Sequence, residues 1–150
     1  MQIHTASQIA KWFLTHNRIM CDEQGAEYIS NAKLQKLLYY AQGCFLAVTG
    51  NPLFSDELVA WRNGPVVESV YEEYLPYGKT GIQFDDDFDF GEFSTAENDL
   101  LREVYDIFGQ YSAWKLRDMV LEETPVKEIK PNASLSLESM KKYFEREHIE

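Results

Sequence analysis

The residues best suited to chemistry in this 150-residue chain are the aspartates of the run from Asp85 to Asp89. Counted from Asp85, carboxylates occupy the first, third and fifth positions, as they do in the calcium-binding loop of an EF-hand. Such a loop has glycine at its sixth position and glutamate at its twelfth, whereas this chain has Phe90 and Ala96 there. We therefore expect a solvated acidic loop, packed onto the protein through Phe84, Phe88, Phe90 and Phe93. A metal-dependent hydrolase built on Asp85–Asp89 is kept as an alternative.

The histidines and cysteines lack the spacing of a metal site or of a catalytic pair. A zinc site needs about four such ligands close together, but His4, His16, Cys21, Cys44 and His148 are scattered along the chain. Cys44 lies in the most apolar stretch, where we expect an inert buried thiol rather than a nucleophile. The chain also has no glycine-rich phosphate loop, no Gly-x-Ser-x-Gly and no His-Glu-x-x-His motif. We therefore predict a protein that is not an enzyme and needs no cofactor.

The net charge is strongly negative and unevenly distributed. Acidic residues number 25 against 14 basic ones, a formal charge of −11. Between Asp56 and Asp99 there are twelve acids and two bases, Arg62 and Lys79, so this third of the chain carries almost all of the excess. Binding to nucleic acid depends on basic residues that neutralise phosphates, so the charge disfavours a nucleic-acid partner. A basic protein partner would instead be attracted to this region.

The sequence also bears on where the protein works. Its apolar runs fall well short of the 18 residues that a membrane span needs. The first residues, Met1 to Thr5, lack the basic start and the apolar run of a secretory signal. The two cysteines do not make a disulfide framework. We expect a cytoplasmic protein with no membrane attachment.

The elements are predicted from N-capping side chains and from apolar residues at helical spacing. Helices are expected at 6–16, 31–48, 65–74, 95–110, 113–123 and 137–147, with capping boxes at Thr5 and Ser94. Residues 17–30 lose the periodicity and are expected to form a loop or a short turn of helix. A short strand at 58–62 is expected to pair with 82–84. The predicted fold class is therefore mainly α: a single globular helical domain, residues 1–150, of about five to six helices with a small two-stranded β element.

The helix predicted at 31–48 is the most informative element. After Lys36 it carries no charged residue and is apolar nearly all round, so we expect it at the centre of the core. Its two cations, Lys33 and Lys36, lie in the first turns, where the helix dipole disfavours positive charge. Because they do not favour the helix itself, we expect them to contact a partner or the acidic segment.

Two segments together are more specific than any single motif. The first runs Asn31-Ala-Lys-Leu-Gln-Lys-Leu-Leu-Tyr-Tyr-Ala-Gln-Gly43, and the second is Leu53-Phe54 followed by Val59-Ala-Trp-Arg-Asn-Gly-Pro-Val-Val67 and Val70-Tyr71. The pair resembles the Panacea domain family, also called SocA-like, whose members include many prophage-encoded proteins. The chain departs from that family after Ser112, where members often carry a Thr-His pair and then Pro-Trp. Those places hold Val120-Leu121 and Pro125-Val126 here.

The resemblance implies an antitoxin, which neutralises a cognate toxin by direct protein–protein binding and without catalysis. The toxin is expected to be encoded by an adjacent gene. Some members of the family act instead as adaptors that deliver a partner to an AAA+ protease, which is the second reading. The candidate partner-binding residues are Lys33, Lys36, Tyr40, Trp61, Asn63, Gly64, Pro65, Glu68, Tyr71 and Glu72. For the group around Trp61 a structural role, as a core anchor followed by a turn, is the competing interpretation.

Overall fold

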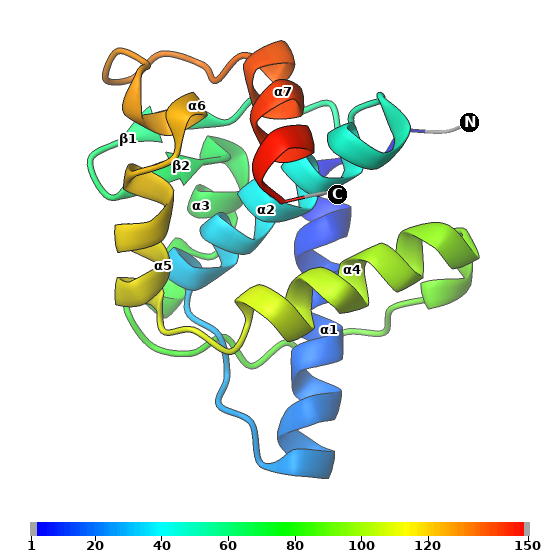
Figure 1. The fold of residues 1–150 in the computed structure, drawn as a ribbon. Coiled ribbons are helices and arrows are strands. Elements are labelled where there is room, and N and C mark those ends of the chain that lie inside the picture. The colour runs from blue at the N-terminus through cyan, green and yellow to red at the C-terminus, as the bar shows by residue number, and fades with distance from the viewer. Residues whose placement is uncertain (1–2, 149–150) are drawn as a thin grey trace.

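The computed structural model describes residues 3–148 (Figure 1). Within them the chain forms seven α-helices, one two-stranded sheet and two single turns of 3-10 helix. In chain order the elements are α1 (Ala6–Gln24), α2 (Asn31–Thr49), β1 (Val59–Trp61), β2 (Gly64–Val66), α3 (Glu68–Glu73), η1 (Leu75–Tyr77), η2 (Phe90–Glu92), α4 (Thr95–Phe108), α5 (Ala113–Leu121), α6 (Thr124–Lys127) and α7 (Leu137–Glu147). The predicted mainly helical class with a two-stranded element is confirmed, with the four-residue helix α6 in addition.

Helix α2 is the centre of the molecule. It packs against α1, α3, α4, α5, α7 and β2, which surround it in Figure 1. Every residue from Leu34 to Leu46 is buried, on all sides of the helix. This confirms the prediction that α2 is a core helix, because a helix that is apolar nearly all round must be covered nearly all round.

The helix starts follow the capping signals in the sequence. Thr5 and Ser94 each form a complete capping box with the residue three places on, Gln8 and Glu97 respectively. Ser30 caps α2 by accepting a hydrogen bond from the backbone N–H of Lys33. Each cap satisfies N–H groups that have no partner within their own helix. The predicted starts of α1, α2 and α4 are therefore confirmed.

Helix α1 is longer than the sequence predicts. It continues to Gln24 and ends at Gly25, which adopts the left-handed conformation of a helix C-cap. The loop or short turn of helix expected over 17–30 is therefore wrong for residues 17–24, which continue α1. The apolar pattern breaks there because a polar residue, Asn17, occupies the buried face. Its amide donates to the carbonyl of Glu27 and accepts from the N–H of Ile29, and so fixes the segment that leads into α2.

The strand pairing also differs from the prediction. β1 pairs with β2 in an antiparallel hairpin, with Trp61 opposite Gly64, and not with residues 82–84. The hairpin turn is Arg62-Asn63, and Gly64 is the first residue of β2. The sequence suggests a helix start instead, because Pro65 is also a favoured first residue of a helix. Helix α3 accordingly begins at Glu68 and not at Pro65. Residues 81–82 instead bridge to the segment before α2, where the N–H of Ile82 donates to the carbonyl of Ile29 at 2.8 Å.

The closest packing against α2 is made by α7, at Gly43. The ring of the fully buried Phe144 lies directly over this glycine, so that a β-carbon on residue 43 would overlap three ring atoms. The same ring packs edge-on against Tyr39, with centroids 5.4 Å apart. The absence of a side chain at Gly43 therefore sets how closely α7 approaches the core.

We predict that Gly43→Ala destabilises the domain by about 1–3 kcal/mol, because the added methyl group forces Phe144 and α7 outward. Urea unfolding followed by far-UV circular dichroism measures this. Val48→Ala, at an exposed position of the same helix, is the control and should change stability little. In a Phe144→Leu background the cost of Gly43→Ala should fall. An equal cost in both backgrounds would contradict the contact.

Candidate functional site

The two segments that carry the family resemblance are joined by side-chain amides of α2. Gln42 accepts from the backbone N–H of Leu53 at 2.8 Å and donates to the carbonyl of Phe54 at 2.9 Å. Gln35 accepts from the N–H of Val67 at 2.9 Å. Both glutamines are buried, so these bonds take the place of the hydrogen bonds to water that the side-chain amides and the backbone groups lose on burial. Both segments are recognisable in the sequence, but the glutamine bonds between them are not.

A further amide continues the same system to α3. Asn31, in the first turn of α2, donates to the carbonyl of Tyr71 at 3.0 Å and accepts from the Gln35 side chain at 3.0 Å. Asn31 and Gln35 thus hold the end of the hairpin and the start of α3 on the N-terminal half of α2. An isolated two-stranded hairpin is only marginally stable. Here the side-chain amides of α2 hold it in place.

The hairpin turn lies close against the residues beneath it. A β-carbon on Gly64 would come within 3.0 Å of Val120 and 3.7 Å of the Lys36 side chain, and the residue has a φ of +125°. Both the space and the backbone conformation favour glycine there. The turn is also tied to α5, because the Nε of Arg117 donates to the Oδ1 of Asn63 at 2.9 Å. On the other side the ring of Trp61 contacts Tyr71, with centroids 4.9 Å apart.

The hairpin with α3 and α5 beside it is the candidate partner-binding face. Of the predicted partner-binding residues, Asn63, Glu68 and Glu72 are exposed, Lys33, Trp61 and Tyr71 are half-buried, and Lys36, Tyr40, Gly64 and Pro65 are buried. Most of the predicted set therefore gathers around the hairpin. Tyr40 does not, because it faces α4 and α7 on another side of α2.

Lys33 has a role at the end of another helix. Its ammonium donates to the carbonyl of Gly109, the C-cap residue of α4, at 2.6 Å. A cation is favourable at that end of a helix, so Lys33 is unfavourable for the start of α2 but favourable for the end of α4. Burial lowers the pKa of Lys33, and the negative charge of Glu27 opposes this.

Lys36 is a buried cation. The residue is 5% exposed, and its ammonium donates to the carbonyl of Ala32, one turn back on the same helix, at 3.1 Å. Within residues 3–148 it takes part in no ion pair. Burial, followed by the positive charge of Arg117, lowers the pKa of Lys36 to about 8. The charged form is therefore costly in the folded state.

A buried carboxylate contacts α2 one helical turn after Lys36. Glu123, which follows α5, accepts from the hydroxyls of Tyr39 at 2.8 Å and Tyr40 at 2.9 Å, and its other contact is with Nε2 of His148 at 3.2 Å. Burial and the negative charge of Glu123 raise the pKa of both tyrosines. Burial, with Glu123 second, also raises the pKa of Cys44 to about 12, so this thiol stays protonated and inert as expected. This network is not predictable from the sequence, because Glu123 lies beside the exposed Glu122 in a polar stretch.

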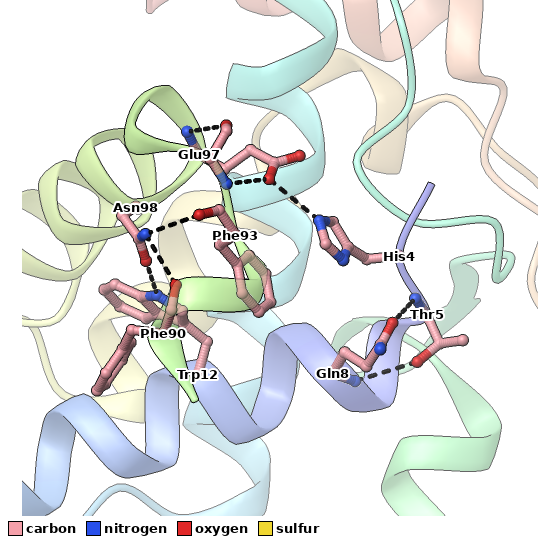
Figure 2. Close-up of polar contacts among 9 residues, drawn as sticks. His4, Thr5, Gln8, Trp12, Phe90, Phe93, Glu97 and Asn98 are labelled. Carbon is pink, nitrogen blue, oxygen red and sulfur yellow. Dashed lines mark hydrogen bonds and ion pairs between the residues drawn. The ribbon is translucent and has the colours of Figure 1, made fainter. Parts of the chain in front are cut away.

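The acidic loop is fastened at its aromatic end, as Figure 2 shows. Asn98 of α4 accepts from the Trp12 indole at 2.8 Å and donates to the carbonyl of Phe90 at 3.1 Å. His4 stacks on Phe93 with centroids 4.3 Å apart. These contacts confirm that phenylalanines pack the loop down.

Two carboxylates of this region, those of Asp89 and Glu97, have structural partners. The Nε2 of His4 lies 3.2 Å from a carboxylate oxygen of Glu97 (Figure 2). Burial raises the pKa of Glu97, but hydrogen bonds from Ser94 and His4 outweigh it, and the net shift is downward. Asp89 accepts from the N–H of Gly91 and so caps η2. Across residues 3–148 no three acidic, histidine or cysteine side chains come together in a way that could hold a metal ion.

None of the helices within residues 3–148 has the length and apolar character to cross a bilayer.

Comparison with known proteins gives two matches. The family model described as "Antitoxin SocA-like, Panacea domain" matches residues 34–125, more than half of the chain and the part that holds most of α2, the hairpin, α3, α4 and α5. A stretch of 50 residues is 54% identical to the antitoxin SocA of Caulobacter vibrioides. That alignment covers 33% of this chain and 27% of the relative, so it spans about a quarter of the relative's length. No solved structure matches the chain.

We predict that Glu123→Ala destabilises the domain by about 2–4 kcal/mol, because it leaves two buried tyrosine hydroxyls without their acceptor. Glu122→Ala is the matched control, since its side chain is 79% exposed and should contribute less than about 0.5 kcal/mol. Urea unfolding at pH 7 measures both variants. Equal stability of the two would contradict the buried network.

We predict that Lys36→Met stabilises the domain at pH 7 by roughly 1–3 kcal/mol, because it removes a buried charge. The folded pKa of about 8 lies below the unfolded value of 10.5, so the unfolded state binds the extra proton between these values and the cost of Lys36 declines as pH rises through them. The advantage of the variant should therefore shrink between pH 7 and pH 9.5. Lys142→Met, on an exposed side chain, is the control. A variant that is less stable at both pH values would contradict the assignment.

Proposed function

Because this chain belongs to the antitoxin SocA-like Panacea family, we propose that it is the antitoxin of a toxin–antitoxin pair. In this proposal it neutralises its toxin by direct binding and without catalysis. The observation that carries the proposal is the family match over residues 34–125. The 54% identity to an antitoxin SocA over 50 residues supports it.

Several side chains of the types used in catalysis have structural roles here, which supports a function without catalysis. Glu123 accepts hydrogen bonds from two tyrosines, the Cys44 thiol is buried and protonated, and Asp89 caps a 3-10 turn. A general acid, base or nucleophile must instead be accessible and in a suitable protonation state. We therefore propose that this domain acts by occupying a surface of the toxin.

The hairpin and α3 form the face that we propose for the toxin. Asn63, Glu68 and Glu72 are exposed there, with Trp61 and Tyr71 half-buried between them. Because buried amides of α2 hold this face, little conformational entropy is lost when a partner binds. The buried members of the predicted set, among them Gly64 and Pro65, would act by shaping this face from beneath.

The acidic middle of the chain would attract a basic partner to this face by long-range electrostatics. Twelve acids between Asp56 and Asp99 create a negative field that speeds the approach of a basic partner. Such charges act mainly on the association rate and on partner choice. We propose a cytoplasmic complex with a toxin encoded next to this gene.

The proposal predicts that expression of the neighbouring gene arrests growth and that co-expression of this chain at an equal level restores it. Because binding is stoichiometric, rescue should fail when the toxin is in several-fold excess. The purified proteins should form a complex on size-exclusion chromatography. A neighbour that stays lethal at equal levels, with no complex formed, would refute the proposal.

The same cells separate masking from proteolytic delivery. If the chain masks the toxin, the toxin's half-life stays unchanged or lengthens while growth recovers. A half-life that shortens only when both this chain and the host AAA+ protease are present would favour an adaptor instead. Pulse-chase labelling of the toxin measures this directly.

A further inference from the structure

Helix α5 exposes an aromatic side chain beside the hairpin turn. Among the large hydrophobic side chains of residues 3–148, Trp114 is the most exposed, at 70%. Trp12, by comparison, is almost fully buried and bonded through its indole N–H. Tryptophan and arginine are the residues most enriched among those that dominate the binding energy of protein interfaces. An indole held in water on a short, well-capped helix is therefore an interface candidate.

Arg117 lies one helical turn after Trp114 and is held in place on two sides. Its guanidinium lies 5.1 Å from the centre of the indole ring, and its Nε donates to Asn63 across the hairpin turn. The side chain is 29% exposed. Its one acidic contact is a long one, 3.5 Å from NH1 to the carboxylate of the adjacent Asp118, which is itself mostly exposed. Arg117 is thus preorganised, with N–H groups left for a closer carboxylate.

The charge around this site is opposite to that of the whole chain. Helix α5 and the hairpin contain Arg62, Lys115 and Arg117 and a single acid, Asp118. The Lys36 side chain lies next to the position that a β-carbon on Gly64 would occupy. It forms no ion pair within residues 3–148. A protein that is −11 overall thus keeps a positive site here at a cost to its stability. Such a site favours an anionic group.

We propose that Trp114, Arg117 and Asn63 form a socket for an acidic side chain of the toxin that is flanked by an apolar one. The carboxylate pairs with the Arg117 guanidinium, and the apolar neighbour covers the Trp114 indole and excludes water from the pair. This inference rests on the proposed antitoxin function and adds to it the site and the chemistry of the contact.

The socket and the acidic residues of α3 lie on either side of the hairpin. Trp61 contacts Tyr71 of α3 on one side, while Asn63 contacts Arg117 of α5 on the other. The face is therefore negative at α3, where Glu68 and Glu72 are exposed, and positive at α5. A toxin that fits it has the reverse arrangement, with basic groups opposite α3. Reversed docking would place like charges together, so the arrangement fixes the orientation of the partner.

The test compares Arg117→Glu and Trp114→Ala with matched controls on α7. Arg146→Glu is the arginine control, because Arg146 also stacks on a ring, that of Tyr143 at 5.5 Å. Leu137→Ala is the control for an exposed apolar side chain. The purified toxin from the rescue experiment is the probe, and calorimetry measures its affinity. Each socket variant should weaken binding by about tenfold or more, and each control by less than about threefold.

Folding is checked separately, because Arg117 also holds Asn63. Trp114→Ala removes an exposed ring and should leave the melting temperature unchanged. Arg117→Lys keeps the charge without the paired N–H groups and should bind between wild type and Arg117→Glu. Loss of affinity in Arg117→Glu alone, with a lowered melting temperature, would mean that the arginine acts only through the fold and would overturn the socket.

The outcomes separate the inference from the function that it rests on. If wild type rescues growth and both socket variants bind the toxin as wild type does, the socket is wrong and the antitoxin proposal stands. If wild type neither binds nor rescues, the antitoxin proposal fails and the socket fails with it. A labelled DNA duplex is the second probe. Duplex binding by wild type that Arg117→Glu abolishes would overturn the assignment to a carboxylate.

Discussion

The burial of α2 on all sides is the constraint from which the rest of the structure follows. Because water is excluded from Leu34 to Leu46, each polar side chain on that stretch needs a partner inside the protein. Gln35 and Gln42 find theirs in the backbone of the hairpin and of the loop before it, and the two tyrosines find theirs in Glu123. The polar residues of the central helix thus determine where the surrounding segments lie. Lys36 is the exception, since it is buried but bonded only to its own helix.

This constraint gives a physical account of the family motif. The segment from Asn31 to Gly43 and the segment around the hairpin are specific together because side-chain amides of one bind the backbone of the other. Residues with such a role specify the architecture and offer little to a partner. The contacts that distinguish one toxin from another then fall to the exposed residues that this scaffold presents. We propose that in this chain those are the exposed acids of α3 and the exposed Trp114, together with the half-buried Arg117 beside it.

The sequence predicted what depends on local chemistry and failed where distant residues decide. The capped helix starts, the central position of α2 and the packed aromatic loop follow from neighbouring residues, and the structure confirms them. The end of α1 was not predictable, because Asn17 is a polar residue on a buried face and its partners lie ten and twelve residues away. The strand partner was missed because Pro65, which lies in β2, also fits the first position of a helix. Glu123 and Trp114 were missed because burial and exposure depend on tertiary contacts, which single-residue patterns do not encode.

The central claim is that a toxin binds the face formed by the hairpin, α3 and α5 on the fixed α2 scaffold. Hydrogen–deuterium exchange of the domain, free and in complex with its toxin, tests this most directly, because it reports every backbone amide at once. The account predicts slower exchange in the complex at residues 61–73 and 113–121, with the already slow amides of α2 unchanged. Protection confined to α1, α7 or the loop over 85–93, or an α2 that exchanges faster in the complex, would contradict it.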